Sequence, residues 1–400
     1  MTQHYKADVV VVGAGLVGLT SAIMSAQQQK TVVLLDTQIK PIKTTSDKNT
    51  DNNITPDWDA RVYALTPASE QWLQSLGAWD WLDKARVSAI NAMHLWSKNN
   101  INPLILKDSD ANLTKLGLIV ENNNLLQALW QQVHALGITV LESEACTKLE
   151  NIQHEIVLHL SSLTTITAKL LVAADGVNSW VRAQANIGVT HKSFNQTAIV
   201  ANFLAEKPHG NIARQWFASH NILALLPLPQ QMVSMVWSVS TEKATQLLAL
   251  ADDALAQSVL EQSQGALGKL TLVGIKQSYL LSQQTANNLI ANRVVFIGDC
   301  AHQIHPMAGQ GVNLGFRDVM KLQQLTTNVH AMIDIGEQTF LRQYERSRRA
   351  DIASINALTS SLDSVFASEH QLLNIVTDWG FKQLNEQSTA KKLLIKQATA

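Results

Sequence analysis

The hydrophobic pattern near the start of the chain predicts a strand, a helix and a second strand. DVVVV (8–12) is a short β-branched run, and glycines separate it from LVGLTSAIMSAQQQ, whose apolar residues have helical spacing. TVVLLD (31–36) is the next apolar run. Short, continuous apolar runs on either side of a helix are typical of buried parallel strands, so we expect a strand–helix–strand unit here.

The pattern changes twice further along the chain. Residues 40–59 are polar, which predicts a surface excursion. Helical spacing returns at 67–82 and 121–137, and strand patterns then extend to residue 176. Between about 185 and 283 most pieces are strand-like, for example ILALLPLP and MVSMVWSVS, and one helical stretch accompanies them. This middle region therefore predicts a mostly antiparallel sheet.

RVVFIGD (293–299) again has the pattern of a buried parallel strand, and helical patterns follow it. The expected fold class is α/β: a Rossmann-type domain built from discontinuous segments, an inserted and mostly antiparallel sheet domain, and C-terminal helices. The expected boundaries are 1–85, 113–183 and 284–350 for the Rossmann-type domain, 86–112 and 184–283 for the inserted domain, and 351–400 for the helical segment.

Composition narrows the class of protein. The chain is 46% hydrophobic and 16% charged, as in a globular protein with a sizeable core, and its net charge of -1 gives no electrostatic reason to expect nucleic acid as a partner. Its two cysteines argue against a disulfide framework. No apolar run approaches the ~20 residues that a spanning helix needs. We expect a cytoplasmic protein, with attachment to a membrane surface left open.

The first chemical motif lies between the first predicted strand and helix. It is a complete GxGxxG, formed by Gly13, Ala14, Gly15, Leu16, Val17 and Gly18. In this motif the first glycine permits a tight turn, the second lets the backbone approach a pyrophosphate, and the third allows close helix–strand packing. Asp36 ends the next strand, where an acid can bond a ribose hydroxyl. The motif predicts a dinucleotide site but does not distinguish NAD from FAD.

A second motif, DGVNSWVR, opens with Asp175 after a predicted strand and ends at Arg182. Taken alone it is ambiguous, because an Asp-Gly turn before a helix that starts with serine is common.

The third motif, GDCAHQIHPMAGQGVNLG (298–315), has two interpretations. Asp299, Cys300, His302 and His305 have the chemistry of metal ligands. Pro306 and the glycines nevertheless argue against a continuous helix that would align the histidines. We therefore expect no metal, and assign His302 and Cys300 to the scaffold. Asp299 follows a strand end, where ligands of open α/β sheets bind. Gly309, Gln310, Gly311 and Val312 begin a helix whose first N–H groups favour negative charge.

Together, GxGxxG, DGxxSxxR and GD running into HPxxGQGxNxG resemble the flavoprotein aromatic hydroxylases, and most closely those of ubiquinone biosynthesis. The resemblance covers nearly the whole chain, including DARVYALTPAS (59–69), LGLIVENNNLLQALW (116–130) and YERSRR (344–349). The stretches around DGVNSWVR and YERSRR favour the type that acts at C5 of a polyprenylphenol.

The resemblance implies FAD as the cofactor and assigns roles to single residues. Gly13, Gly15 and Gly18 would approach the pyrophosphate, with Asp175 nearby, and Asp36 would bind the ribose. Arg61 would reach the phosphates or the flavin edge, and Arg182 would meet the nicotinamide nucleotide. Asp299 and Gly298 would hold the ribityl chain, and Pro306 would border the isoalloxazine. Its pyrimidine edge would contact Gly311, Val312 and Asn313, with Gly309, Gln310 and Val120 also placed at the cofactor.

The resemblance also implies the reaction. O2 and NADPH or NADH would be consumed, a C4a-hydroperoxide of the flavin would transfer oxygen to a prenylated phenol or quinol, and no side chain would act as catalyst. Other ubiquinone-biosynthesis proteins and a second copy of the chain are the partners that it suggests. The alternatives are another ring position, another phenol, or a non-catalytic flavin-binding assembly subunit. A flavin reductase or halogenase is disfavoured, because a second GxGxxG, a CxxC and a WxWxI are all missing.

Three surface and pocket assignments complete the sequence-based picture. Trp216 and Trp237, in the sheet region, are the candidates to line a substrate cavity. The arginines of 342–349 are interpreted as a solvated helix face or an interface. KKLLIKQ (391–397) is basic and amphipathic, which suits contact with a membrane surface, an ordinary C-terminal helix or a subunit contact.

Overall fold

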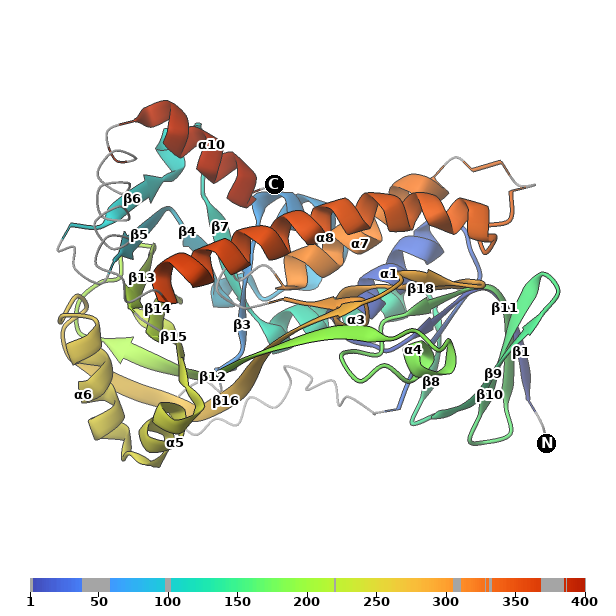
Figure 1. The fold of residues 1–400 in the computed structure, drawn as a ribbon, viewed down its shortest axis with the longest axis horizontal. Helices are drawn as coiled ribbons and strands as arrows, with labels where there is room; N and C mark the ends of the chain where they lie inside the picture. The colour runs from blue at the N-terminus through green and yellow to red at the C-terminus, as the bar shows by residue number, and fades with distance from the viewer. Residues whose placement is uncertain are drawn as a thin grey trace.

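The computed structural model describes residues 3–37, 58–97, 102–218, 221–304, 311–327, 329–330, 333–367, 385 and 387–399. Most of the polar stretch at 40–59 lies outside these residues, as do Pro306, Gly309, Gln310 and His305. Figure 1 shows the two large sheets side by side along the long axis of the molecule.

The first sheet has eight strands with a parallel centre. Its strands are β1 (His4–Val12), β2 (Val32–Asp36), β8 (Thr139–Glu142), β9 (Cys146–Ile152), β10 (Glu155–Leu160), β11 (Thr165–Ala173), β17 (Ile290–Ala291) and β18 (Val294–Phe296). Their order is β17-β18-β11-β1-β2-β8, with β10 and β9 attached beside β11. The pairs β11–β1, β1–β2, β2–β8 and β11–β18 are all parallel. The loops that follow β1, β2, β11 and β18 therefore emerge at one edge of the sheet, and these loops contain all three motifs.

Helices cover this sheet and begin at its motif-bearing edge. They are α1 (Leu16–Gln27), α3 (Asn122–Ala135), α4 (Trp180–Gln184) and α7 (Gly311–Thr326). α1 packs against both α3 and α7. The sheet and helices bury one large apolar core in which Val10, Val11 and Leu171 are fully inaccessible.

The second sheet also has eight strands and is almost entirely antiparallel. Its strands are β5 (Ala92–Trp96), β6 (Leu104–Lys107), β12 (Val189–Ala205), β13 (Ile212–Ala218), β14 (Asn221–Pro227), β15 (Met232–Ser240), β16 (Leu270–Ala286) and β19 (His302–Gln303). They run in the order β19-β16-β12-β15-β14-β13-β5-β6, and only β13 and β5 pair in parallel. Helices α5 (Thr241–Ala249) and α6 (Asp252–Gln262) pack against this sheet and close a second core.

A small third sheet joins the two larger ones. It consists of β3 (Val62–Leu65), β4 (Val87–Ile90) and β7 (Gly117–Glu121) in the order β3-β7-β4. Helix α2 (Pro67–Ser75) follows β3, and the Thr66 side chain caps it by accepting the Ser69 N–H while Pro67 occupies its first turn. Short 3-10 turns lie at η1 (Ala78–Trp81), η2 (Lys84–Arg86), η3 (Asp108–Ala111) and η4 (Gly298–Cys300).

Two further helices complete the fold. α8 (Gln338–Ala367) has 30 residues and contacts β17 of the first sheet and β13 of the second. Figure 1 shows it running along the molecule across both sheets. α10 (Ser388–Thr399) packs against η3, and Ile395 is buried there in a third apolar cluster. Among the described residues, no helix is both long and apolar enough to cross a bilayer.

These observations confirm the predicted fold class. A parallel sheet built from segments far apart in the chain is joined to a mostly antiparallel sheet. The domain boundaries stay a prediction. The strand expected at 293–299 is shorter than predicted, because Gly298 adopts a φ of 60° that ends the extended conformation.

Truncation of the second core should affect stability strongly. Leu223 is 0% exposed between β14 and the helices, so Leu223→Ala should lower the free energy of unfolding by roughly 2–5 kcal/mol. Leu204→Ala is the matched control, because Leu204 is 46% exposed, and its effect should stay within about 0.5 kcal/mol. Urea unfolding followed by circular dichroism measures both. Equal losses would contradict the assignment of Leu223 to a tightly packed core.

Candidate functional site

Two of the three motif glycines are required by close packing within the protein. Gly13 has a φ of +104°, and a Cβ there would lie 2.4 Å from the carbonyl oxygen of Ala174. A Cβ on Gly18 would lie 1.9 Å from the carbonyl oxygen of Gly13. The loop is thus pressed between β11 and its own helix, and side chains at these two positions would force it open.

Gly15 differs from the other two. Its φ of -72° is accessible to any residue, and a Cβ there would meet nothing within 4 Å. Neither backbone conformation nor packing demands glycine at this position, which directly precedes the first residue of α1. A missing side chain in open space at a helix N-terminus suits the approach of an anionic group to the backbone.

Asp36 and Asp175 both order the loops around this position. Asp36 Oδ2 accepts the N–H of Ala14 at 2.7 Å, which ties the end of β2 to the glycine loop. Asp175 Oδ2 accepts the N–H of Val181 at 3.0 Å, and Gly176 turns the chain with a φ of +80°. The predicted contacts of these carboxylates with ribose and pyrophosphate stay predictions.

Arg182 connects the second motif to the third. Arg182 is only 8% exposed. Its guanidinium donates hydrogen bonds to the carbonyl oxygens of Val177 at 2.7 Å and Cys300 at 2.8 Å. Ser179 caps α4 by accepting the N–H of Arg182. The predicted contact of Arg182 with a nicotinamide nucleotide gains no support from this buried position.

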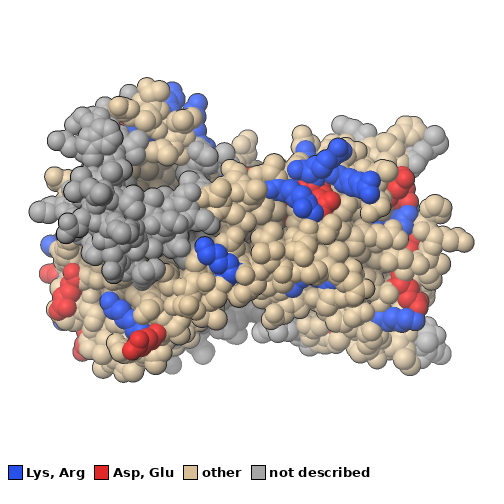
Figure 2. All heavy atoms as spheres, viewed as in Figure 1, with Lys and Arg blue, Asp and Glu red and all other residues tan. Residues whose placement is uncertain are grey.

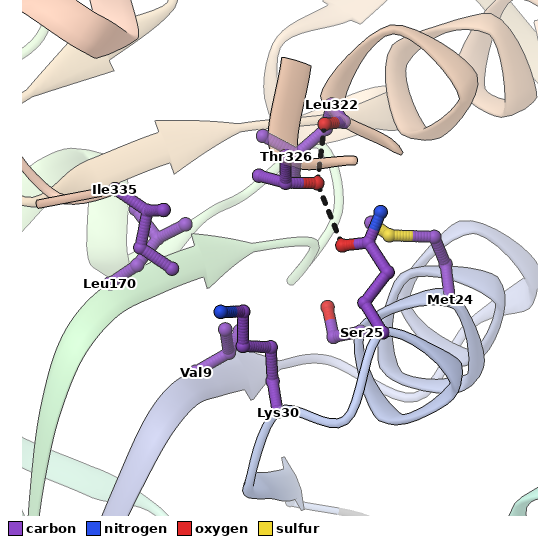
Figure 3. Close-up of a pocket in the computed structure, with 9 residues that line it drawn as sticks. Val9, Met24, Ser25, Lys30, Leu170, Leu322, Thr326 and Ile335 are labelled. Atoms are coloured by element: carbon purple, nitrogen blue, oxygen red, sulfur yellow. Dashed lines mark hydrogen bonds between the residues drawn. The ribbon is translucent and has the colours of Figure 1, made fainter. Parts of the chain in front are cut away.

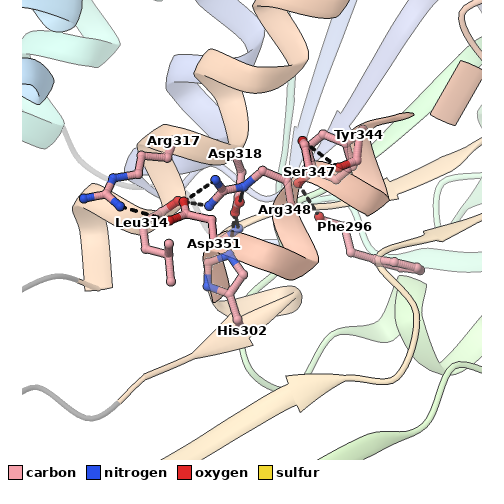
Figure 4. Close-up of polar contacts among 10 residues, drawn as sticks. Phe296, His302, Leu314, Arg317, Asp318, Tyr344, Ser347, Arg348 and Asp351 are labelled. Carbon is pink, nitrogen blue, oxygen red and sulfur yellow. Dashed lines mark hydrogen bonds and ion pairs between the residues drawn. The ribbon is translucent and has the colours of Figure 1, made fainter. Parts of the chain in front are cut away.

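The turn at Gly298 is held by a buried ionic network (Figure 4). Asp318, on α7 and 0% exposed, accepts the N–H of Gly298 at 2.8 Å and Nε2 of His302 at 2.7 Å through Oδ2. Its other oxygen accepts Nε of Arg348 at 2.7 Å. Arg348 comes from α8 and also pairs with Asp351. His302 is thus a scaffold residue, as the sequence predicted.

The charges of this network keep Asp318 ionised. Burial alone would raise the pKa of its carboxyl, but His302, Arg348 and the Gly298 N–H together lower it below its ordinary value. Cys300, beside the same turn, has the opposite behaviour: burial and the neighbouring Asp175 raise the pKa of its thiol well above the usual range. Its thiol therefore stays protonated, in agreement with a scaffold role.

Asp299 lies on the outer side of this turn. Its side chain is exposed, yet the surrounding protein desolvates the carboxyl and raises its pKa, while the charges of His302 and Arg61 oppose that rise. This is a suitable position for accepting hydrogen bonds from a polar ligand.

Arg61, the residue directly before β3, reaches the same region and contacts two aromatic rings. Its guanidinium carbon is 5.3 Å from the centroid of Tyr63 and 5.9 Å from that of Tyr279, which belongs to the second sheet. Burial raises the pKa of Tyr63 to about 12; the charge of Arg61 lowers it and that of Asp299 raises it further. The residues Arg61, Tyr63, Tyr279 and Asp299 thus bring both large sheets together at one place.

The remaining predicted residues belong to the starts of α7 and α1 and to β7. Asn313 accepts the Thr66 N–H at 3.1 Å and donates to the Ala64 carbonyl at 2.8 Å, so it joins α7 to the end of β3. Val312 is buried, and a Cβ on Gly311 would meet nothing within 4 Å. Val120 is 0% exposed within β7, opposite Tyr63. Leu16 is buried, and Val17 packs beside Gly298.

Two predictions from the sequence are wrong. Trp216 and Trp237 belong to the core between the second sheet and α5 and α6, where they are 4% and 2% exposed. Trp216 stacks on Trp96 and Trp237 donates to Asn221, so neither is placed to line a substrate cavity. Arg348 is also not on a solvated face, since it is 5% exposed and paired with Asp318.

The sequence analysis missed Asp318 and the pairing of Arg348 with it. A signal was present, because Asp318 occupies a position between Leu314 and Leu322 on the buried face of α7. A charged residue at such a position needs a buried partner. Three other arginines on α8, at 342, 346 and 349, are exposed as predicted and concealed this exception.

The other features of the described residues do not suggest a second functional site. A small hollow lined by Val9, Met24, Lys30, Leu170, Leu322 and Thr326 lies at the carboxyl ends of α1 and α7, away from the motif edge (Figure 3). Within the described ranges, no group of three His, Cys, Asp or Glu residues could hold a metal ion. Basic and acidic side chains are interspersed over the face in Figure 2, in line with the net charge of -1.

The class of protein follows from this geometry. An α/β sheet with an open glycine at a helix N-terminus, an acid after the second strand, and a Gly-Asp turn at the same edge fits a bound dinucleotide, and a mostly antiparallel sheet adjoins it. Residues 6–357 match the family described as FAD binding domain, and the chain belongs to this family.

Relatives of nearly the same length agree with this membership. The chain is 31% identical to "Ubiquinone hydroxylase UbiL" of Rhodospirillum rubrum over 396 residues, which cover 98% of this chain and 89% of that protein. It is 29% identical to "Ubiquinone biosynthesis monooxygenase COQ6, mitochondrial" of Homo sapiens, with 97% of this chain and 91% of that protein covered. For "3-demethoxyubiquinol 3-hydroxylase" of Escherichia coli K12 the identity is 27%, with 98% of both chains covered.

Solved structures show the same fold. The chain superposes on "p-nitrophenol 4-monooxygenase PnpA" of Pseudomonas putida DLL-E4 with a TM-score of 0.78 at 15% identity, covering 100% of this chain and 99% of that one. The family expected from the three motifs, and FAD as the cofactor, are confirmed.

The contrast between Gly15 and Gly18 can be tested directly. Gly18→Ala should lower the free energy of unfolding of the apoprotein by roughly 1–3 kcal/mol, because the new Cβ overlaps the Gly13 carbonyl. Gly15→Ala should change it by less than about 1 kcal/mol, yet raise the dissociation constant of FAD about tenfold. Thermal unfolding and titration of the apoprotein with FAD separate these effects. Unchanged FAD affinity in Gly15→Ala would contradict a close approach of the cofactor there.

Proposed function

We propose that this protein is an FAD-dependent monooxygenase that hydroxylates the aromatic ring of a prenylated phenol or quinol in ubiquinone biosynthesis, with position C5 favoured. The observation that carries the proposal is the meeting of Asp299 and Arg61 with Tyr279 of the second sheet at the edge where the cofactor motifs emerge. Near-full-length similarity to proteins named as ubiquinone hydroxylases supports this substrate class.

The residues of the first sheet hold the cofactor. Gly13, Gly15 and the N-terminus of α1 receive the pyrophosphate, Asp36 bonds the ribose, and Asp299 bonds the ribityl chain. The start of α7, at Gly311 and Val312, would hold the pyrimidine edge of the flavin, where the helix dipole would stabilise negative charge. Bound FAD supplies the chemistry that activates O2 for transfer to the ring.

The residues at the junction of the two sheets orient the substrate. Arg61 contacts both Tyr63 and Tyr279, so its charge has a defined position beside the aromatic rings. The ring of a phenol would enter next to these residues, and its apolar chain would need an apolar path. Arg61, Tyr279 and Asp299 are exposed at this junction, so the bound substrate itself would have to exclude water there for oxygen to be transferred to its ring.

The electron donor and partners are part of the same proposal. NADPH or NADH reduces the cofactor, binding transiently because the sequence carries one GxGxxG. The protein works in the cytoplasm, at a membrane surface where prenylated substrates are found, in contact with other ubiquinone-biosynthesis proteins or a second copy of itself. Its alternative is a flavin-binding subunit without activity of its own.

The activity is tested with purified holoprotein, NADPH or NADH, and prenylated phenols under ¹⁸O2. We expect one labelled oxygen in the product, detected by mass spectrometry, and donor oxidation that depends on the phenol. The quinone intermediates that accumulate in cells lacking the protein identify the ring position that is hydroxylated. Restoring the gene should remove these intermediates, which shows that loss of this protein caused them. Absence of label from every substrate with either donor would overturn the hydroxylase proposal in favour of the non-catalytic alternative.

Asp299 provides a second test, of the cofactor assignment alone. Asp299→Ala should weaken FAD binding about ten- to a hundredfold, because a charged hydrogen-bond acceptor is lost. Asp299→Asn keeps an acceptor and should lose less. Asp80→Ala, at an exposed position in η1, is the control and should retain FAD normally. An Asp299→Ala protein that purifies with a full complement of FAD would show that this residue does not hold the cofactor.

A further inference from the structure

The buried carboxylate of Asp318 lies behind the cofactor turn, out of reach of any ligand. It is 0% exposed, and its oxygens are occupied by the Gly298 N–H, His302 and Arg348. A charge removed from water in this way is tolerated only when it is paired and bonded, and loss of one partner leaves the other uncompensated. Loss of any partner of Asp318 would therefore be strongly destabilising.

That point sets the backbone conformation of the turn. Gly298 has a φ of +60°, and a Cβ there would lie 3.2 Å from Val17 Cγ2, so the backbone passes close to the glycine loop. Asp318 holds the N–H of Gly298 from one side, and Arg182 holds the carbonyl of Cys300 from the other. Asp299 lies between these two anchors. Its position is therefore set by side chains that are themselves buried.

Arg348 brings the countercharge from α8. Figure 4 shows it between Asp318 and Asp351, with Tyr344 directed at the carbonyl of Phe296, the last residue of β18. The Tyr344 hydroxyl donates to that carbonyl at 3.0 Å. One helix thus fixes both the end of the strand and, through Asp318, the turn after it.

We propose that Asp318 and Arg348 are positioning residues for FAD: they preform the turn that presents Asp299, so that FAD affinity depends on a buried ion pair remote from the cofactor. The proposal rests on the FAD cofactor and not on the hydroxylation, so its test is independent of the substrate. Arg348 belongs to YERSRR (344–349), which gives this stretch a physical role.

Arg348→Met tests the proposal, with Arg293→Met as the matched control. Arg293 is also buried, at 3% exposure, and pairs with Asp334. It directly precedes β18, whereas the Gly298 turn follows the other end of that strand. Both changes remove a buried arginine from an ion pair and should destabilise the protein. Only Arg348→Met should raise the dissociation constant of FAD, by about tenfold or more, while Arg293→Met stays within about twofold.

The pH dependence of FAD binding is a readout that general destabilisation would not reproduce. Asp318 is faced by Arg348 and Tyr344 from α8, His302 from β19 and the Gly298 N–H from η4, with Asp351 and Arg317 beyond Arg348. Arg348 lowers the pKa of Asp318, so removing Arg348 raises it. On acidification the carboxylate of Asp318 is then protonated at a higher pH than in the wild type. FAD affinity should therefore fall at a higher pH in Arg348→Met than in the wild type.

Arg348→Lys keeps the positive charge and should recover part of the affinity and of the wild-type pH profile. If Arg348→Met does not fold, Arg348→Lys and Asp318→Asn are compared with Arg293→Lys and Asp334→Asn in the same titration. The proposal is overturned if the Arg348 and Asp318 variants, folded by near-UV circular dichroism, bind FAD as tightly as the Arg293 and Asp334 variants. It is also overturned if all variants share one pH profile.

Discussion

The rest of the site depends on one constraint, the close packing of three chain segments around the side chain of Val17. These segments are the glycine loop, the turn at Gly298 and helix α7. A Cβ on Gly315 would lie 2.6 Å from Val17 Cγ2, and one on Gly298 3.2 Å from the same atom. The glycine loop, the turn after β18 and helix α7 therefore pack closely at Val17, where a side chain on Gly315 would force a shift. Because loop 13–18 is itself fixed by Gly13 and Gly18, this packing places the Gly298 turn beside the glycine loop, and the buried side chains of Asp318 and Arg182 then hold the turn that carries Asp299.

Local patterns predicted much of the fold. The unit β1–α1–β2 could be predicted because its apolar runs and glycines are contiguous in sequence. The alternating region could be assigned to an antiparallel sheet for the same reason. The parallel pairing of β5 with β13 could not, because each strand is short and its partner lies more than a hundred positions away. Tertiary context decides such pairings, since strand propensity reflects the neighbours that a strand packs against.

The candidate site divides in the same way. Motif residues whose role is carried by backbone geometry, such as Gly13, were recognisable from spacing. Arg348 was not, because the arginines around it are exposed and the sequence of α8 does not reveal a single ionic contact with α7. Trp216 and Trp237 show a related limit. Alternation places them on one face of the sheet, but only the packing of α5 and α6 shows that this face is closed.

This division also explains how the fold persists with little sequence identity. The chain shares 15% identity with a p-nitrophenol monooxygenase and still superposes with a TM-score of 0.78. Close packing of the glycine loop, the Gly298 turn and the start of α7 needs glycine at few positions, so it constrains little of the sequence. The junction of β3 and β16 instead depends on contacts between side chains, and Arg61 with Tyr279 is such a pair. Asn202 donates to the Asp59 carbonyl nearby and fixes the spacing of the two sheets there. The junction of the sheets is therefore specified by individual side chains, whereas the packing around Val17 is specified by a few glycines.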